Sequence, residues 1–326
     1  MRRREFITLL GGAVVTWPLA ANAQQSVRRI GVLMPYPESD AEAQSWIAAF
    51  REDFAKLGWA EARNVRLDIR WGANAALIQQ FARELVGLQP DLILTSGTPA
   101  TAALLRETRT IPIVFAIVAD PIGSGFVASF PRPGGNVTGF TNIESTMAGK
   151  WLELLKEVAP RVDRVALLFN PVTTPLEYFL TPFKAAAPLL GMQPIAAPVR
   201  DTPELEAAVA ELARAPNGGL IVMPDSFMAA HRVEITSLAA RYRLPAVYSN
   251  RQFAQAGGLL SFGNDISDNY RRAAGYVDRV LKGEKPSELP AQFPVKFELT
   301  INLKTAATLG LAVPLFLQQR ADEVIE

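Results

Sequence analysis

Polar loops that precede predicted helices are the parts of this sequence best suited to chemistry. Thr98 is followed by Pro99, a residue favoured at the first position of a helix. The unpaired N–H groups and the positive dipole end of such a helix favour a carboxylate or another anion. Asp225 and Ser226 occupy the corresponding place further along the chain. Helix capping explains either loop by itself, but the repetition of the arrangement favours a ligand site.

Asp120 is a third polar position of this kind, held before Pro121. Its carboxylate would pair with a ligand amine, and the alternative is an ordinary Asp-Pro turn. Four aromatic residues are candidates for the walls of such a site, with burial in the core as the alternative: Tyr36, Trp46, Phe227 and Tyr248.

Catalytic, metal and cofactor sites find no support in the sequence. The chain has no cysteine, which excludes disulfides, thiolate zinc sites and a cysteine nucleophile. His231 is the only histidine and no G-x-S-x-G motif is present, so the usual metal clusters and a Ser-His-Asp triad are not predicted. The G-x-G-x-x-A string at 123–128 follows an Asp-Pro turn, unlike a dinucleotide fingerprint, and there is no P-loop. We expect a cleft with no catalytic residue, no metal and no cofactor.

The elements that position these loops follow a repeated order. The stretch from Asp91 to Pro121 predicts a buried strand, a Ser96-Gly97-Thr98 loop, a helix, a second buried strand and the Asp120 loop. The stretch from Gly219 to Asn250 repeats this order. Ligands of open α/β sheets bind beyond the carboxyl ends of the strands, where these loops lie. Two similar α/β halves therefore predict a ligand held between two lobes.

Length and composition agree with two globular domains. The chain has 326 residues, 49% of them hydrophobic and 20% charged. Its net charge is +1, and without the first basic cluster (Arg2, Arg3, Arg4 and the adjoining Glu5) 30 basic and 31 acidic residues remain. A nearly neutral body shows no electrostatic footprint for nucleic acid or an anionic membrane surface.

The N-terminus has the layout of an export signal. A basic start is followed by an apolar run and by Ala21-Asn22-Ala23, a small-x-small cleavage site. Arg3 and Arg4, followed by Phe6, fit the twin-arginine pattern. The alternative is an uncleaved anchor, but Gly11, Gly12 and Pro18 interrupt a run that is already short for a membrane span. We expect residues 1–23 to be a Tat-type signal peptide and the mature chain to work in the periplasm, without direct membrane insertion.

The lobes are not expected to be contiguous in sequence. Residues 24–142 and about 256–285 are predicted to form the N-terminal α/β lobe, and residues 143–255 and about 286–326 the C-terminal one. The chain would then cross between the lobes near 140–146, 250–260 and 285–295. Such crossings are hinge candidates, because a few loop residues can absorb a closing motion.

Several longer strings resemble a known family. They are residues 110–115, 119–121, 132–139, 256–259, 281–286, 297–306 and 321–326. Together they are similar to the ABC transporter substrate-binding protein family, whose studied members include tryptophan/tyrosine-binding proteins. The resemblance implies a type I periplasmic-binding-protein fold, with two Rossmann-like lobes with parallel sheets, three crossovers and a ligand in the cleft. Carried over by position, it implies ligand contacts at Ser96, Gly97, Thr98, Asp120, Pro121, Asn142, Asp225, Ser226 and Asn250.

The resulting expectation is a monomeric periplasmic substrate-binding protein that delivers its ligand to an ABC permease. The ligand would be a small organic solute, an amino acid or a related carboxylate, held by hinge closure. One alternative is a sensor receptor that signals to a membrane kinase or chemoreceptor. A second is an enzyme that uses the same cleft. A third, the effector domain of a lactose-repressor-type regulator, is disfavoured by the export signal and by the lack of a DNA-binding head.

Overall fold

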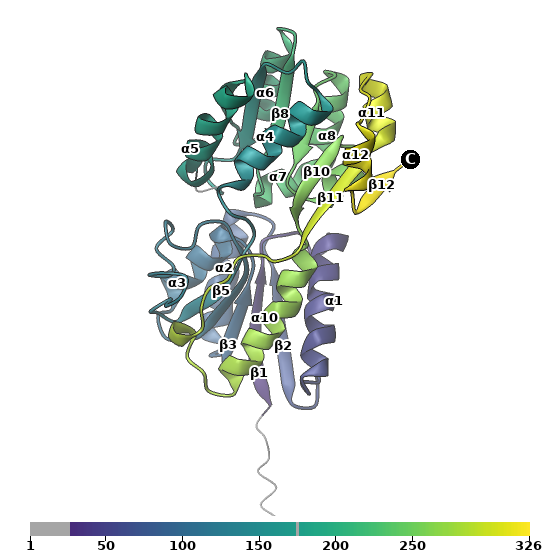
Figure 1. The fold of residues 1–326 in the computed structure, drawn as a ribbon. Coiled ribbons are helices and arrows are strands. Elements are labelled where there is room, and N and C mark those ends of the chain that lie inside the picture. Colours follow the sequence, from purple (N-terminus) through teal and green to yellow (C-terminus); the bar gives the residue numbers. More distant parts are fainter. Residues whose placement is uncertain (1–26, 174–175) are drawn as a thin grey trace, which may run out of the picture.

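Two α/β lobes lie one above the other in the computed structural model, which describes residues 27–173 and 176–326 (Figure 1). The predicted signal peptide, 1–23, lies outside the described residues. No helix within the described ranges has both the length and the apolar character that a membrane crossing requires.

The first lobe contains a five-stranded parallel sheet with the order β2-β1-β3-β4-β5. Its strands are β1 (Arg28–Met34), β2 (Val65–Trp71), β3 (Leu92–Thr95), β4 (Ile113–Val118) and β5 (Val137–Thr141). The helices α1 (Ala41–Lys56), α2 (Ala75–Gly87), α3 (Thr98–Glu107) and α10 (Ile266–Leu281) cover it. Every residue of β3, β4 and β5 is buried, because helices cover both faces of a parallel sheet.

The second lobe repeats this order and extends it. Its seven-stranded sheet has the order β12-β11-β10-β9-β8-β6-β7. Strand β11 is antiparallel to β10, and β12 is parallel to β11, so these two strands run opposite to the other five. The strands are β6 (Arg164–Phe169), β7 (Gln193–Pro198), β8 (Gly218–Val222), β9 (Ala246–Tyr248), β10 (Leu260–Asn264), β11 (Phe297–Asn302) and β12 (Glu323–Ile325). Strands β6 to β10 therefore repeat the arrangement of β1 to β5.

The helices of the second lobe are mostly short. They are α4 (Met147–Val158), α5 (Leu176–Ala186), η1 (Ala187–Leu190), α6 (Thr202–Ala213), α7 (Ser226–Ala230), α8 (Arg232–Arg241), α9 (Arg251–Gln255), α11 (Leu303–Leu309) and α12 (Leu315–Gln319). The single helix predicted after Asp225 is divided at His231 into α7 and α8.

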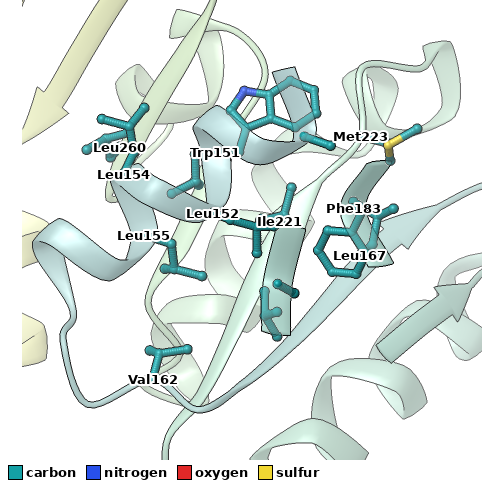
Figure 2. Close-up of a cluster of buried hydrophobic side chains, with 14 of the residues drawn as sticks. Trp151, Leu152, Leu154, Leu155, Val162, Leu167, Phe183, Ile221, Met223 and Leu260 are labelled. Carbon is teal, nitrogen blue, oxygen red and sulfur yellow. The ribbon is translucent and has the colours of Figure 1, made fainter. Parts of the chain in front are cut away.

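A cluster of apolar side chains around Trp151 forms the main core of the second lobe (Figure 2). Trp151, Leu152 and Leu155 are fully buried, and their helix α4 packs on β8 and β9. The indole Nε1–H donates to the carbonyl oxygen of Phe262 at 2.7 Å, so the one polar atom of this side chain is satisfied. Burial with a hydrogen-bond partner is the usual arrangement for tryptophan.

The chain crosses between the lobes three times, at 142–146, 264–266 and 293–296. The structure divides the segment 256–285, which we expected in the first lobe. Strand β10 pairs with β9 and β11 and so belongs to the second sheet, whereas α10 packs on α1 of the first lobe. Residues 286–292 lie with the first lobe, because Gln292 N–H donates to Gly139 and Thr138 Oγ1 donates to Leu289. The short apolar run of β10 gave no sign in sequence of the sheet it joins.

Asp265 and Lys296 join the second and third crossings. Lys296 Nζ lies 2.8 Å from Asp265 Oδ2, and Asp265 N–H donates to the Lys296 carbonyl at 3.0 Å. Burial alone would raise the pKa of Asp265, but the Lys296 ammonium and the N–H of Asp268 hold that pKa below its ordinary value of 3.8. A carboxyl with a lowered pKa stabilises the fold above its unfolded pKa, and this contribution is lost as the pH falls through the folded value.

We therefore expect Asp265→Asn to lower the urea midpoint at pH 7, and we expect the difference from the unmodified chain to shrink below about pH 4. Asparagine is as good a helix N-cap as aspartate, so the start of α10 is kept. Equal differences at pH 7 and pH 3 would show that the charge on Asp265 contributes nothing to stability.

Candidate functional site

The repeated strand order places a topological switch point in each lobe. In both sheets the chain leaves the first strand of the repeat and returns on its other side, at β1/β3 and at β6/β8. Ligands of doubly wound sheets bind in the crevice beyond the carboxyl ends of the strands at such a point. The loops after β1 and β3 face those after β6 and β8 across one cavity between the lobes.

This interlobe cavity has a volume of about 50 Å³. Its described lining residues come from both lobes: Tyr36, Trp46, Gly97, Thr98, Pro99, Ile117, Ala119, Asn142, Thr173, Pro224, Asp225, Ser226, Ala229, Ser249, Asn250, Asn264 and Ile266. The space is small compared with typical ligand pockets of about 300–1,000 Å³. A ligand larger than this cavity therefore requires the lobes to move apart before it can enter.

Six of the nine contact residues predicted from sequence line this cavity: Gly97, Thr98, Asn142, Asp225, Ser226 and Asn250. The other three do not reach it. Ser96 is fully buried beneath the cavity. Asp120 accepts the Gly123 N–H at 2.8 Å, and Pro121 is buried while its carbonyl closes the same turn. Asp120 and Pro121 therefore form an Asp-Pro turn, and their contact with a ligand stays a prediction.

Three buried side chains on the cavity wall have a polar atom with no hydrogen-bond partner. These atoms are Asn142 Oδ1, Ser249 Oγ and Asn264 Nδ2, and the side chains are at most 8% exposed. Asn142 follows β5 and Asn264 ends β10, the corresponding strand of the second lobe. A buried polar group without a partner costs about 1–3 kcal/mol. Because all three atoms belong to residues that line one cavity, we expect polar groups of a ligand to bind there.

The charges around the cavity suit a ligand that carries both signs. Helix α3 starts at Thr98, which lines the cavity, and its N-cap Gly97 provides no side-chain hydrogen bond. The positive end of the helix dipole therefore lies at the cavity wall. Across the cavity, Asp225 accepts from Met228 N–H at 2.8 Å and Asn170 N–H at 3.2 Å. Asp225 is the one charged residue among the described lining residues.

Tyr36 and Trp46, two of the four aromatic candidates, line the cavity and also pack in the core of the first lobe. Their rings meet edge to face at 5.3 Å, and Trp46 stacks on Tyr270 at 5.9 Å. Burial raises the pKa of Tyr36 well above its ordinary value, and the carboxylates of Asp40 and Asp225 add to this, so its phenol stays protonated. Phe227 and Tyr248 instead pack in the core of the second lobe.

Sequence reasoning missed Thr173, Ser249 and Asn264. Thr173 follows β6 as Tyr36 follows β1, so the switch-point rule would have found it once the strand order was known. Asn264 and Ser249 are brought together by Gly263, whose missing side chain lets β10 lie against Ser249; an added Cβ would overlap the Ser249 carbonyl. A glycine in a strand is the sequence signal for such a close approach.

Comparison with known proteins decides the family. The sequence profile described as "ABC transporter substrate binding protein" matches residues 40–325. The chain belongs to this family. It is 24% identical over 287 residues to a tyrosine-binding protein of Clostridioides difficile. The match covers 87% of this chain and 81% of that protein.

Solved structures agree with the family assignment. The ABC domain in complex with L-Trp from Streptococcus pneumoniae has a TM-score of 0.85 and 26% identity, and the match covers 92% of this chain and 100% of that one. A conserved domain protein from Vibrio cholerae has a TM-score of 0.84 and 25% identity at the same coverage. The predicted type I periplasmic-binding-protein fold is confirmed, and the protein is an ABC transporter solute-binding protein for a small ligand.

Proposed function

We propose that this substrate-binding protein serves an ABC importer, exported to the periplasm by the twin-arginine route and acting there as a monomer. It captures a small organic solute between its lobes by hinge closure and presents the closed form to an ABC permease. The ligand class is an amino acid or a related carboxylate.

The observation that carries this proposal is the set of unpartnered buried polar atoms on one interlobe cavity. Asn142 follows β5 of the first lobe and Asn264 ends β10 of the second, so these atoms come from both lobes. A ligand that satisfies atoms from both lobes binds the closed arrangement better than the open one, and this difference is what drives closure.

The two ends of an amino acid fit opposite sides of this cavity. Its carboxylate would meet the N–H groups at the start of α3, and its ammonium would meet Asp225 and Asn142 Oδ1. The family relatives support the same class, since one is a tyrosine-binding protein and another was solved with L-Trp. The side chain of the ligand would lie against Tyr36 and Trp46.

Thermal unfolding of the mature chain, from Gln24 onwards, with a panel of amino acids and organic acids tests this proposal. A ligand that binds only the folded state adds about 2.7 kcal/mol of stability when present at 100 times its Kd. We expect at least one amino acid to raise the unfolding midpoint by roughly 5 °C.

The matched control for each active amino acid is the carboxylic acid with the same side chain but no α-amino group. We expect it to produce little or no shift, because it cannot pair with Asp225. If no amino acid or organic acid in the panel moved the midpoint, the ligand class would be wrong. An equal shift with the deaminated acid would leave the amine contact without support.

A further inference from the structure

Two polar contacts join the lobes outside the interlobe cavity. Arg232 Nη1, at the start of α8, lies 3.2 Å from Asp40 Oδ2 at the start of α1. Gln252 Nε2 on α9 donates to Glu42 Oε2 at 2.9 Å. None of these four residues is among the described lining residues of the interlobe cavity, and each contact has one partner in each lobe. All four line an adjoining hollow of about 20 Å³, which shares Tyr36, Trp46, Ala229 and Asn250 with the cavity.

Arg232 connects two parts of the cavity wall. The same Nη1 donates to the Ala229 carbonyl at 2.9 Å, and Ala229 lines the cavity from the second lobe. Tyr36 lines the cavity from the first lobe, and Asp40 follows Tyr36 closely in the chain. The ion pair therefore bridges a segment next to each of the two walls.

The Asp40–Arg232 ion pair is partly shielded from solvent. The Asp40 side chain is only 10% exposed and that of Arg232 is 27% exposed. Exposed pairs contribute little because water and salt screen them, and screening weakens as the partners are buried. Asp40 is also held rigidly, because its Oδ1 accepts the N–H groups of Glu42 and Ala43 as the N-cap of α1.

We infer that Arg232 is a positioning residue that holds the closed arrangement through Asp40, as a latch that does not touch the ligand. The latch can form only when the lobes are together. It therefore raises the population of the closed state before any ligand binds and slows the opening that releases one. The role of the latch in solute capture rests on the proposed function. The effect of the latch on closure of the two lobes does not depend on that function.

The distance between the lobes in the ligand-free protein tests this inference directly. Because the chain has no cysteine, spin labels can be placed at Ala48→Cys on α1 and Ala185→Cys on α5, both exposed positions, without competing thiols. Double electron–electron resonance then gives the open and closed populations. We expect Arg232→Met to raise the open-to-closed ratio roughly fivefold, and Arg232→Lys to restore much of the closed population.

Two further variants separate a latch from a general structural role. Asp40→Asn keeps the α1 cap but removes the charge, so it should shift the populations as Arg232→Met does, and the double variant should add little more. Arg241→Met is the matched control, since its 3.0 Å pair with Glu206 lies within the second lobe. The latch would be overturned if Arg232→Met left the distance distribution unchanged. It would also be overturned if the shift in the double variant equalled the sum of the shifts in Arg232→Met and Asp40→Asn. Because no ligand is present, these results stand whether or not the melting panel identifies one.

Discussion

Trp151→Ala should lower the free energy of unfolding by about 3–5 kcal/mol. The side chain is fully buried in the second-lobe core (Figure 2), and its ring stacks on that of Phe179 at 6.3 Å. Truncation removes its apolar contacts, leaves a cavity and deprives the Phe262 carbonyl of its 2.7 Å hydrogen bond. The expected thermal midpoint is roughly 10 °C lower.

Two variants calibrate this prediction. Trp151→Phe keeps most of the apolar volume but not the indole N–H, so it should cost about 1–3 kcal/mol. Leu189→Ala, at a side chain that is 85% exposed, should change stability by no more than about 0.5 kcal/mol. Urea unfolding monitored by circular dichroism measures all three. If Trp151→Ala destabilised the protein no more than Leu189→Ala does, the assignment of this core would be wrong.

Asp225→Asn should weaken binding of the selected amino acid by roughly 30-fold or more, while the protein stays folded. The substitution removes the negative charge that would meet the ligand ammonium. Asparagine still accepts the Met228 N–H as the N-cap of α7, but it gives up the second oxygen that accepts the Asn170 N–H. We therefore expect a stability loss of only about 1 kcal/mol.

Asp201→Asn is the matched control for this variant. Asp201 caps α6 through the Glu204 N–H at 2.9 Å, as Asp225 caps α7, but it is exposed and is not among the described residues that line the cavity. Isothermal titration of both variants compares a charge at the cavity with a charge at an ordinary cap. If both variants bound the amino acid with equal affinity, Asp225 would not be a ligand contact.

Much of the fold was predictable because its strands carry a clear pattern. Strands β3, β4 and β8 are short apolar runs bounded by turn residues, and the order of elements around Thr98 recurs around Ser226. The residues at which each lobe begins and ends were harder to predict from the sequence. Strand β10 is no more apolar than its neighbours, and it joins the second sheet through pairing with β9 and β11, which are distant in sequence. Non-local pairing of this kind leaves no local signal.

The site was predictable where a helix begins in a polar loop. The positions of Thr98 and Asp225 on the cavity wall are predictable because residues that start or cap a helix have a recognisable type and position. The same reasoning selects Asp120, whose carboxylate accepts the Gly123 N–H in an Asp-Pro turn. The sequence alone does not distinguish such a turn from a ligand contact. Asn264 and Ser249 were missed because an isolated polar residue at a strand end becomes informative only once the strands are placed side by side.

A crystal structure of the mature protein with its amino acid ligand tests the central claim most directly. We predict that the ligand lies between the lobes, with its carboxylate at the start of α3 and its ammonium within hydrogen-bond distance of Asp225 and Asn142. A ligand bound elsewhere would contradict this account. The clearest alternative is the hollow of about 420 Å³ in the second lobe, whose lining includes Pro160, Tyr242 and Leu311.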